Sequence, residues 1–432
     1  MSGRTIVGRR AFLGGSVAAV GTALAGCIGG GGGSSDTVKI GVLEDQSGNF
    51  ALVGTPKWRA SKLAIDEINE NGGIDGKEIE LFDPDPQSNN DRYLQLTKQL
   101  INEENVDALW AGYSSATRET IRPTIDRNEQ LYFYTTQYEG GVADEYTFCI
   151  GATARQQLGS VVPYLIDEFG TGDTASIYTI AADYNFGQLS ADWVKVIAEE
   201  NGGEVIGEEF IPLEVSSFGS TISDIEEADP DIVMALLVGA NHASFWSQRT
   251  SAGLEIPMGT STVMAQGHQH KRLDTGTLAN VYGGFNYMEE LPNERNTKDG
   301  GFVDRYYEAF PDADYANEEC VNNYASIYMY KEAVEQAGTT DQAEVIATLE
   351  DGMEVTGDNS PEGDITLSGS VHHVNHKMHV MKCDEEHNIT VEDSRPIPEK
   401  FLSDTVGVDL SGEDDGKTEQ YTPVDYFDEA GE

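Results

Sequence analysis

Hydrophobic and polar positions along most of the chain repeat with the two periods that distinguish strands from helices. Residues 37–43 place Val38, Ile40 and Val42 on one face, with the period of two that a strand shows. Residues 57–71 place apolar side chains at helical spacing instead and are followed by two glycines, as helix ends often are. This change of period predicts a strand followed by a helix.

The same alternation recurs over the next three hundred residues or so. Further apolar runs that predict strands lie at 106–112, 131–136, 175–181, 231–239 and 281–286. Amphipathic stretches that predict helices lie at 92–104, 116–128, 188–201, 243–253 and 322–338. Strands that alternate with helices are typical of βαβ units, so we predict an α/β protein with largely parallel sheets. A chain of this length exceeds what one hydrophobic core usually organises, which favours two lobes.

The charge of the chain excludes one class of function. The 432 residues include 75 Asp and Glu against 27 Lys and Arg, a formal net charge of −48. A nucleic-acid-binding protein needs a basic surface, and none is available here. The acids are spread along the whole chain and only 13 basic residues are Lys, which favours a surface adapted to high salt, as in a halophilic organism. The alternative is an acidic patch that awaits a cation or a basic partner.

The first residues differ in charge from the rest of the chain. Residues 1–26 contain three arginines and no acid, and Arg9-Arg10 stands just before an apolar stretch too short to span a bilayer. This pattern resembles a twin-arginine export signal. It ends at Leu-Ala-Gly-Cys27, which resembles a lipoprotein signal in which Cys27 receives the lipid. Residues 27–36 then form a Gly/Ser tether. We therefore expect an exported protein anchored to the outer face of the cytoplasmic membrane, the alternative for residues 1–26 being an ordinary N-terminal helix.

Three cysteines remain after Cys27, namely Cys149, Cys320 and Cys383. An odd number cannot pair completely, so either one disulfide or three buried free thiols are expected. No C-x-x-C spacing points to a metal site. Asn388 begins a glycosylation sequon, a pattern that is also common by chance.

Motifs of known catalytic chemistry are missing from the sequence. There is no G-x-S-x-G, no H-E-x-x-H and no complete Walker loop. Their absence is weak evidence by itself and becomes stronger when another function accounts for the same residues, as the binding function described below does; we therefore expect a protein that is not an enzyme.

Polar side chains follow the predicted strand 106–112. Tyr113, Ser114 and Ser115 come directly after it and precede the helix predicted over 116–128. Free N–H groups at a helix N-terminus, together with serine hydroxyls, suit a carbonyl oxygen or a carboxylate of a ligand. Serine is also a favoured N-cap residue, so ordinary capping explains the same serines.

A second polar cluster ends the predicted strand 131–136. Alternation along this strand would point Tyr132, Tyr134 and Thr136 to one side, the last two near its C-terminal end. Ligands of open α/β sheets bind beyond these strand ends, so Tyr134 and Thr136 are candidate ligand-binding residues. Core packing is the alternative for Tyr132.

Two further strand ends carry comparable groups. Tyr184 follows the apolar run 175–181, and Gly239 and Asn241 follow the run 231–238. Polar strand ends in both predicted lobes are what a cleft between lobes requires. Aromatic rings with a few neutral hydrogen-bonding groups favour a small polar ligand, which can be uncharged.

Several segments together resemble one group of proteins. They are VKIGVLEDQSG (38–48), AIDEINENGGIDGKEIEL (64–81), residues 113–122, FYTTQYEG (133–140) and GGEVIGEEFIPL (202–213), and the resemblance covers most of residues 37–382. By these segments the chain is similar to the solute-binding proteins of ABC transporters for urea and short-chain amides, a group within the branched-chain amino-acid-binding family, here as a haloarchaeal-type lipoprotein. The phrase YEG after an aromatic-rich strand is the most specific of these marks.

The resemblance implies two Rossmann-like lobes joined by a hinge, the periplasmic-binding-protein type I or Venus flytrap fold. Residues 37–151 plus about 283–350 would form the first lobe, and residues 152–282 plus about 351–402 the second. The remaining segment, 403–432, has ten acids and one Lys and is expected to wrap loosely or fray.

The resemblance also implies roles for single residues. Tyr113 and Ser115 would hold the carbonyl side of the ligand, and Tyr134 and Thr136 would approach it from the same lobe. Tyr184 and residues 239–241 would close over it from the other lobe.

Two stretches depart from the urea and amide group. Residues 182–187 lack the proline and arginine that often follow this tyrosine and look nearer to the amino-acid binders. Residues 265–270, AQGHQH, stand where the group commonly has consecutive acids. A branched-chain or other amino-acid receptor is therefore the alternative function, and an amidase or a sensor without a permease are remoter ones.

No cofactor or metal is expected, and the expected partners are a small ligand and ABC permease subunits. His372, His373, His376 and His379 lie within eight residues, which is one pattern of a metal site. Because the segment 360–373 resembles a strand and turn of the same family that carries a histidine pair, we expect these histidines to be structural.

Overall fold

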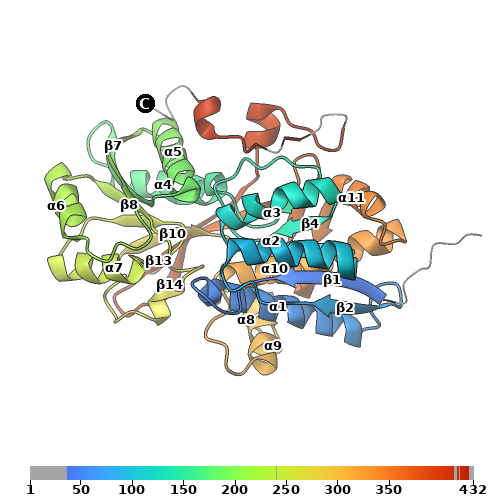
Figure 1. Cartoon of the computed structure of the whole chain (residues 1–432). Helices are drawn as coiled ribbons and strands as arrows, with labels where there is room; N and C mark the ends of the chain where they lie inside the picture. The colour runs from blue at the N-terminus through green and yellow to red at the C-terminus, as the bar shows by residue number, and fades with distance from the viewer. Residues whose placement is uncertain (1–36, 240, 413–415, 418, 428–432) are drawn as a thin grey trace, which may run out of the picture. The chain divides into compact units, whose positions relative to one another are not determined.

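The computed structural model describes residues 37–239, 241–412, 416–417 and 419–427 (Figure 1). The predicted export signal at 1–26, the lipid anchor Cys27 and the tether at 27–36 lie outside these residues.

Eleven strands follow one another along the path of a single sheet, and most neighbours are parallel. One group of five parallel strands has the order β2 (Glu78–Phe82), β1 (Thr37–Leu43), β3 (Ala108–Ala111), β4 (Tyr132–Tyr134) and β5 (Thr147–Cys149). A second parallel group has the order β10 (Val281–Phe285), β9 (Met258–Thr260), β8 (Ile232–Leu236), β6 (Ala175–Ala182) and β7 (Gly203–Ile211). The largely parallel arrangement predicted from the sequence is confirmed.

One long strand, β13 (His373–Cys383), joins the two groups. Its first residue pairs with Cys149 of β5, and its later residues pair antiparallel with β10 and with β14 (Ile389–Ile397). Two short strands, β11 (Met353–Val355) and β12 (Ile365–Ser368), pair antiparallel with each other, and β12 also pairs with the start of β13. β11 and β12 thus extend the β1–β5 side, which differs from the assignment of about 351–402 to the second lobe.

Helices connect the strands and cover the sheet. The α-helices are α1 (Ala51–Glu70), α2 (Asn90–Gln99), α3 (Ser115–Asn128), α4 (Ala154–Phe169), α5 (Asn185–Glu200), α6 (Gly219–Ala228), α7 (Asn241–Ala252), α8 (Glu294–Thr297), α9 (Phe302–Ala309), α10 (Glu318–Ala337) and α11 (Gln342–Glu350). Short helices of other types are η1 (Leu100–Glu104), η2 (Gln269–Lys271), η3 (Gly357–Asn359), η4 (Phe401–Val406) and η5 (Pro423–Asp425). Figure 1 shows α2 beside α3 and α4 beside α5, and both pairs are in contact.

The hydrophobic pattern explains which faces are buried. Val38, Ile40 and Val42 of β1 are fully buried in the main core, as the period of two predicts. Helix α1 begins at Ala51, six residues before the predicted start, although Pro56 removes one of its N–H donors. The backbone of Gly54 packs directly on Asp45, where an added Cβ would lie 2.4 Å from the carbonyl oxygen. This tertiary contact supports the first turns of a helix whose periodicity is visible only later.

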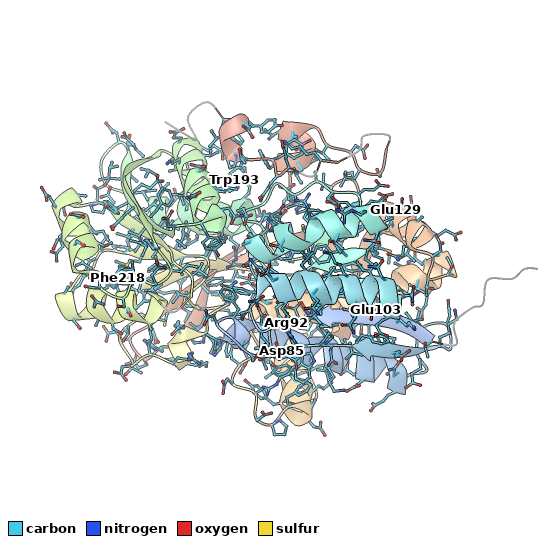
Figure 2. All side chains as sticks on the ribbon, viewed as in Figure 1. Asp85, Arg92, Glu103, Glu129, Trp193 and Phe218 are labelled. Carbon is cyan, nitrogen blue, oxygen red and sulfur yellow. The ribbon has the colours of Figure 1, made fainter. Side chains whose placement is uncertain are left out.

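The C-terminal segment differs from the loose tail expected for 403–432. Leu402, at the end of the preceding segment, and Leu410 are buried, and the N–H of Tyr421 donates to the carbonyl of Gly141 over 2.8 Å. Phe427 packs edge-on against Trp193 of α5, which Figure 2 labels below the red C-terminal segment. Acidic composition alone did not reveal that these apolar and backbone groups find partners on the folded body.

The three cysteines described by the structure, Cys149, Cys320 and Cys383, are all buried free thiols. Burial raises the pKa of the Cys149 and Cys383 thiols to about 12, so both are protonated at neutral pH. The structure therefore selects free thiols over the single disulfide that the sequence left open.

The four clustered histidines have separate partners. The rings of His372 and His376 each contact a glutamate, Glu350 and Glu362 respectively. The ring of His373 contacts a tyrosine hydroxyl, and that of His379 a serine hydroxyl. Over the described ranges, no group of three or more His, Cys, Asp or Glu side chains is arranged to hold a metal ion. Within the same ranges, no helix combines the length and apolar character that crossing a membrane requires.

Candidate functional site

A small cavity lies beyond the C-terminal ends of strands β3, β4, β6 and β8. It is lined by residues that follow these four strands and by one residue after β9, which are Tyr113, Ser114, Ser115, Thr136, Gln137, Tyr184, Phe186, Val238 and Gln266. Its free volume is ≈ 10 Å³, about what a single water-sized sphere requires. The cavity is thus at the edge of the sheet where ligands of open α/β folds bind.

The turn after β3 supplies three of the lining residues. Ser114 is the N-cap of α3, and its hydroxyl accepts the N–H of Thr117 over 3.1 Å. The hydroxyl of Ser115 donates to a carboxylate oxygen of Glu139 over 2.5 Å. The structure therefore shows the capping role for Ser114 and places all three predicted residues of this turn at the cavity.

Of the two candidate residues predicted at the end of the second strand, Tyr134 and Thr136, only one lines the cavity. Thr136 lines the cavity, whereas Tyr134 is not among the lining residues. The hydroxyl of Tyr134 donates to the backbone carbonyl of Tyr113 over 2.9 Å, and its ring packs against the guanidinium of Arg118. Strand β4 ends at Tyr134, so the alternation that would have placed Tyr134 and Thr136 on one side does not continue between them.

Two of the three predicted residues of the second strand group, Tyr184 and Gly239, lie at or next to the cavity. Tyr184 lines it, as does Val238 at the end of the run after β8. Gly239 lines an adjoining recess of ≈ 380 Å³ that it shares with Tyr113 and Gln266. Asn241 begins α7, and its side chain lies outside the described part of the chain.

Lys57, a buried residue that the sequence did not suggest, donates a hydrogen bond to Thr136 in the lining of the cavity. Lys57 of α1 is fully buried and pairs with Glu44 at 2.8 Å. Its ammonium group also donates to the Gly112 carbonyl at 2.9 Å and to the Thr136 hydroxyl at 2.8 Å. Burial raises the pKa of Glu44 to about 7, although Lys57 opposes the shift. Lys57 lies three residues before the buried Ala60, and this helical spacing is the signal that could have placed it inward.

A buried carboxylate, that of Glu319 on α10, contacts two lining residues of the cavity. It accepts the backbone N–H of Gln137 at 3.1 Å and the side-chain amide of Gln266 at 3.0 Å. Gln266 in turn accepts the hydroxyl of Tyr113 at 3.1 Å. Burial raises the pKa of Glu319 to about 7, against the attraction of Lys57. Nothing in the sequence pointed to this role, since Glu319 is separated along the chain from its partners Gln137 and Gln266 by 182 and 53 residues.

The stability contributed by Glu319 depends on pH. Its pKa is about 7 in the folded protein against an ordinary value of 4.5. Between these values the folded protein binds more protons at this carboxyl than the unfolded chain, so the contribution to stability falls as pH rises through the window. Glu319→Gln removes this titration, and its free energy of unfolding relative to the parent protein should therefore improve as pH rises from about 4.5 to about 7.

Guanidinium chloride unfolding at pH values on both sides of this window measures the difference. The matched control is Glu308→Gln, since Glu308 is exposed on α9. Its difference from the parent protein should stay level across the same pH range. A difference for Glu319→Gln that is independent of pH would contradict the prediction.

No charged side chain is among the residues that line the cavity in the described part of the chain. The nearby carboxylates are engaged by donors of the protein. Glu139, for example, accepts hydrogen bonds from Ser115, Arg118 and Asn185. The lining therefore offers hydroxyl and amide groups together with aromatic surface, which suits a small neutral ligand.

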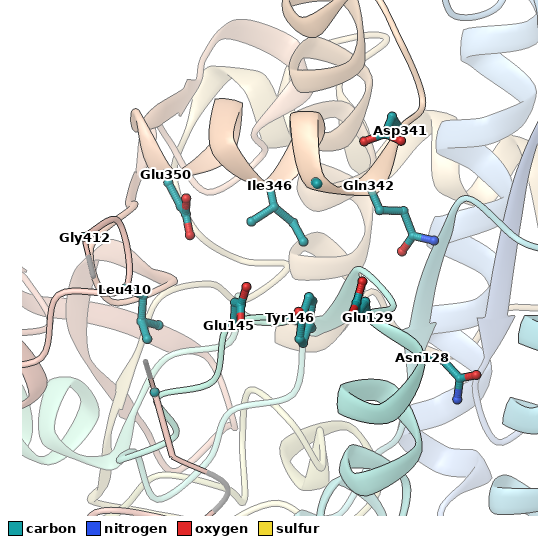
Figure 3. A pocket seen from close by; sticks show the side chains of 12 residues that line it. Asn128, Glu129, Glu145, Tyr146, Asp341, Gln342, Ile346, Glu350, Leu410 and Gly412 are labelled. Carbon is teal, nitrogen blue, oxygen red and sulfur yellow. The ribbon is translucent and has the colours of Figure 1, made fainter. Parts of the chain in front are cut away.

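A larger pocket of ≈ 580 Å³ has a different character (Figure 3). It is lined by the end of α3, by the two residues before β5, by α11 with its N-cap and by part of the C-terminal segment, so it shares no lining residue with the cavity at the strand ends. Four acids, Glu129, Glu145, Asp341 and Glu350, are among its lining residues. Its position and its carboxylates make it the weaker candidate for the site of a neutral ligand.

A comparison with known proteins shows the family to which the chain belongs. A sequence profile described as periplasmic binding protein matches residues 37–388, and the chain belongs to this family. The Leu/Ile/Val-binding protein homolog 8 of Brucella abortus is 28% identical over 228 residues, which cover 50% of this chain and 55% of that protein. The chain thus matches little more than half the length of this relative.

Solved structures show the fold. A solute-binding protein of an ABC transporter from Rhodopseudomonas palustris, in complex with 3,4-dihydroxybenzoic acid, has a TM-score of 0.72 at 18% identity, covering 84% of this chain and 98% of that one. The substrate-binding protein LivJ from Streptococcus pneumoniae, in complex with isoleucine, has a TM-score of 0.70 at 18% identity, covering 84% and 99%. The protein therefore has the periplasmic-binding-protein type I fold, an α/β fold with a mixed sheet.

Proposed function

We propose that this protein is the extracytoplasmic solute-binding component of an ABC importer and that it captures urea or a short-chain amide in the cavity beyond the strand ends. The observation that carries the proposal is the uncharged lining of this cavity, with its hydroxyl and amide groups. An ionic ligand transferred there from water would lose hydration without gaining a counter-charge.

The alternative ligands of the fold fit this lining less well. Isoleucine, which the Streptococcus pneumoniae protein holds, carries an ammonium group that needs a carboxylate. The carboxylates of Glu139 and Glu319, which contact lining residues of the cavity, already accept several protein donors.

An amino-acid receptor is the second candidate, and one observation favours it. Two larger recesses, of ≈ 430 and ≈ 380 Å³, share lining residues with the central cavity. Tyr184 and Val238 belong to the first of them, and Tyr113 and Gln266 to the second. A branched side chain has room in either recess.

The importer role implies a place and a partner. The export signal and Cys27 would place the protein outside the cytoplasmic membrane, anchored by a lipid. β13, which joins the two strand groups, is where a hinge between lobes would lie. Closure around the ligand would then present both lobes to the permease, with the ligand supplying the contacts that favour the closed state.

Calorimetry of the purified protein in high salt tests the function. Urea, formamide and acetamide are expected to bind with measurable heat, and leucine and benzoate are not. Heat with leucine alone would replace the proposal by the amino-acid receptor. Release of ammonia from acetamide would indicate an amidase, in which case Ser115→Ala should abolish turnover.

A further inference from the structure

The side-chain amide of Gln137 at the cavity makes no hydrogen bond with the residues that the structure describes. Gln137 lines the cavity and is 3% exposed. Neither its amide oxygen nor its amide nitrogen makes a hydrogen bond within the described residues. Buried side-chain amides nearly always have partners, so a partner from outside the protein is the expected explanation.

The surroundings of Gln137 hold its backbone and leave its side chain available. Its N–H donates to both oxygens of the Glu319 carboxylate, at 3.1 and 3.2 Å. The preceding residue, Thr136, is fixed by Lys57 at 2.8 Å. The other glutamine of the cavity, Gln266, is occupied at both ends, by the hydroxyl of Tyr113 and by Glu319. Gln137 therefore presents a free amide from a rigid position.

The chemistry of this amide defines what it can recognise. A glutamine side chain offers an acceptor oxygen and a donor N–H on the same edge. The matching partner presents a donor and an acceptor in the reverse order, as a primary amide or urea does with its carbonyl and the N–H next to it. A secondary amide is overwhelmingly trans and holds its N–H on the side away from its carbonyl. A carboxylate has acceptors only, one of which would face the oxygen of Gln137.

We propose that Gln137 pairs edge to edge with the –CO–NH₂ group of the ligand and thereby selects urea and primary amides over N-alkylated amides and carboxylates. This inference rests on the proposed function of the cavity as a ligand site. It adds to that function the residue that distinguishes primary amides from other ligands and the ligand atoms with which this residue forms hydrogen bonds.

Two isomers of equal size test the selection in the parent protein. Propionamide has the paired carbonyl and N–H on one edge, and N-methylacetamide does not. By calorimetry, propionamide is expected to bind at least about tenfold more tightly, as the loss of one or two hydrogen bonds implies. Equal affinities would overturn the role of Gln137 while leaving the amide-binding function intact.

The variant Gln137→Met tests the residue itself. Methionine has a similar length and no hydrogen-bonding edge, so affinity for propionamide should fall about 10- to 100-fold and the preference over N-methylacetamide should disappear. The thermal midpoint of the variant without ligand should be unchanged or higher, because no protein hydrogen bond of this side chain is lost. A purely structural side chain would instead lower that midpoint and leave the preference in place.

The control is Gln95→Met, at an exposed position on α2, which should alter neither affinity nor preference. If Gln137→Met keeps the preference for propionamide, the inference fails and the function stands. If the parent protein binds leucine and none of the amides, the proposed function fails and the inference falls with it.

Discussion

Replacing Lys57 by methionine is expected to lower the free energy of unfolding by about 3–5 kcal/mol. Lys57 and Glu44 are both fully inaccessible to solvent, and their charged groups lie 2.8 Å apart. Without the ammonium group, Glu44 must either remain as an unpaired buried carboxylate or take up a proton. Because burial already raises the pKa of Glu44 to about 7, and the loss of Lys57 raises it further, the destabilisation should grow as pH rises through neutrality.

Guanidinium chloride unfolding of three variants separates the pair from the loss of packing. Lys62→Met lies on the same helix, where Lys62 is 40% exposed and pairs with Asp66; it should change stability by less than about 0.5 kcal/mol. In the double variant Lys57→Met with Glu44→Gln, no carboxylate remains at position 44, and more than half of the lost stability should return. A loss below about 1 kcal/mol for Lys57→Met would show that the pair contributes no more than a surface ion pair.

Arg118→Met is expected to have an effect of similar size, about 3–5 kcal/mol. Arg118 is buried between the rings of Tyr134 and Tyr138, at 4.9 and 4.6 Å, and its guanidinium donates to Glu139 at 2.9 Å. Methionine preserves much of the apolar contact but leaves the buried carboxylate of Glu139 without its cation. The C-terminal segment should also loosen, because Gln420 donates to the same carboxylate at 2.8 Å.

Thermal unfolding and limited proteolysis measure the two consequences. Arg127→Met is the matched control, since Arg127 is exposed on the same helix, and its stability should stay within about 0.5 kcal/mol of the parent protein. Cleavage of Arg118→Met should begin in the C-terminal segment, beyond residue 400. An unchanged thermal midpoint together with an intact C-terminus would contradict the role assigned to this arginine.

The order of strands and helices was predictable because periodicity is a local property of the sequence. The strand 37–43 was predicted with the bounds it has in the structure, and the helix predicted over 116–128 begins one residue earlier. The predicted order of strands also explains why four of the predicted residues lie around one cavity, namely Tyr113, Ser115, Thr136 and Tyr184. Parallel strands end at one edge of a sheet, so the residues that follow them lie close together.

The direction in which a single side chain points was harder to predict from the sequence. Alternation predicted that Tyr134 and Thr136 would face the same side, but β4 ends at Tyr134 and only Thr136 reaches the cavity. Strand periodicity holds only while the strand is paired, and the sequence does not show where pairing stops. The C-terminal segment illustrates the same limit, since its contacts with Gly141 and Trp193 join positions far apart along the chain.

The sequence by itself determined the α/β alternation, the expected family and most of the residues at the strand ends, because each depends on neighbours within a few positions. Only the tertiary structure decided which polar groups are already satisfied. Lys57 pairs with Glu44, and Glu319 accepts a hydrogen bond from Gln266. The side-chain amide of Gln137, in contrast, makes no hydrogen bond with a described residue. Hydrogen bonds between distant segments form only when the chain is folded, and among the described residues that line the cavity they leave the side-chain amide of Gln137 without a partner.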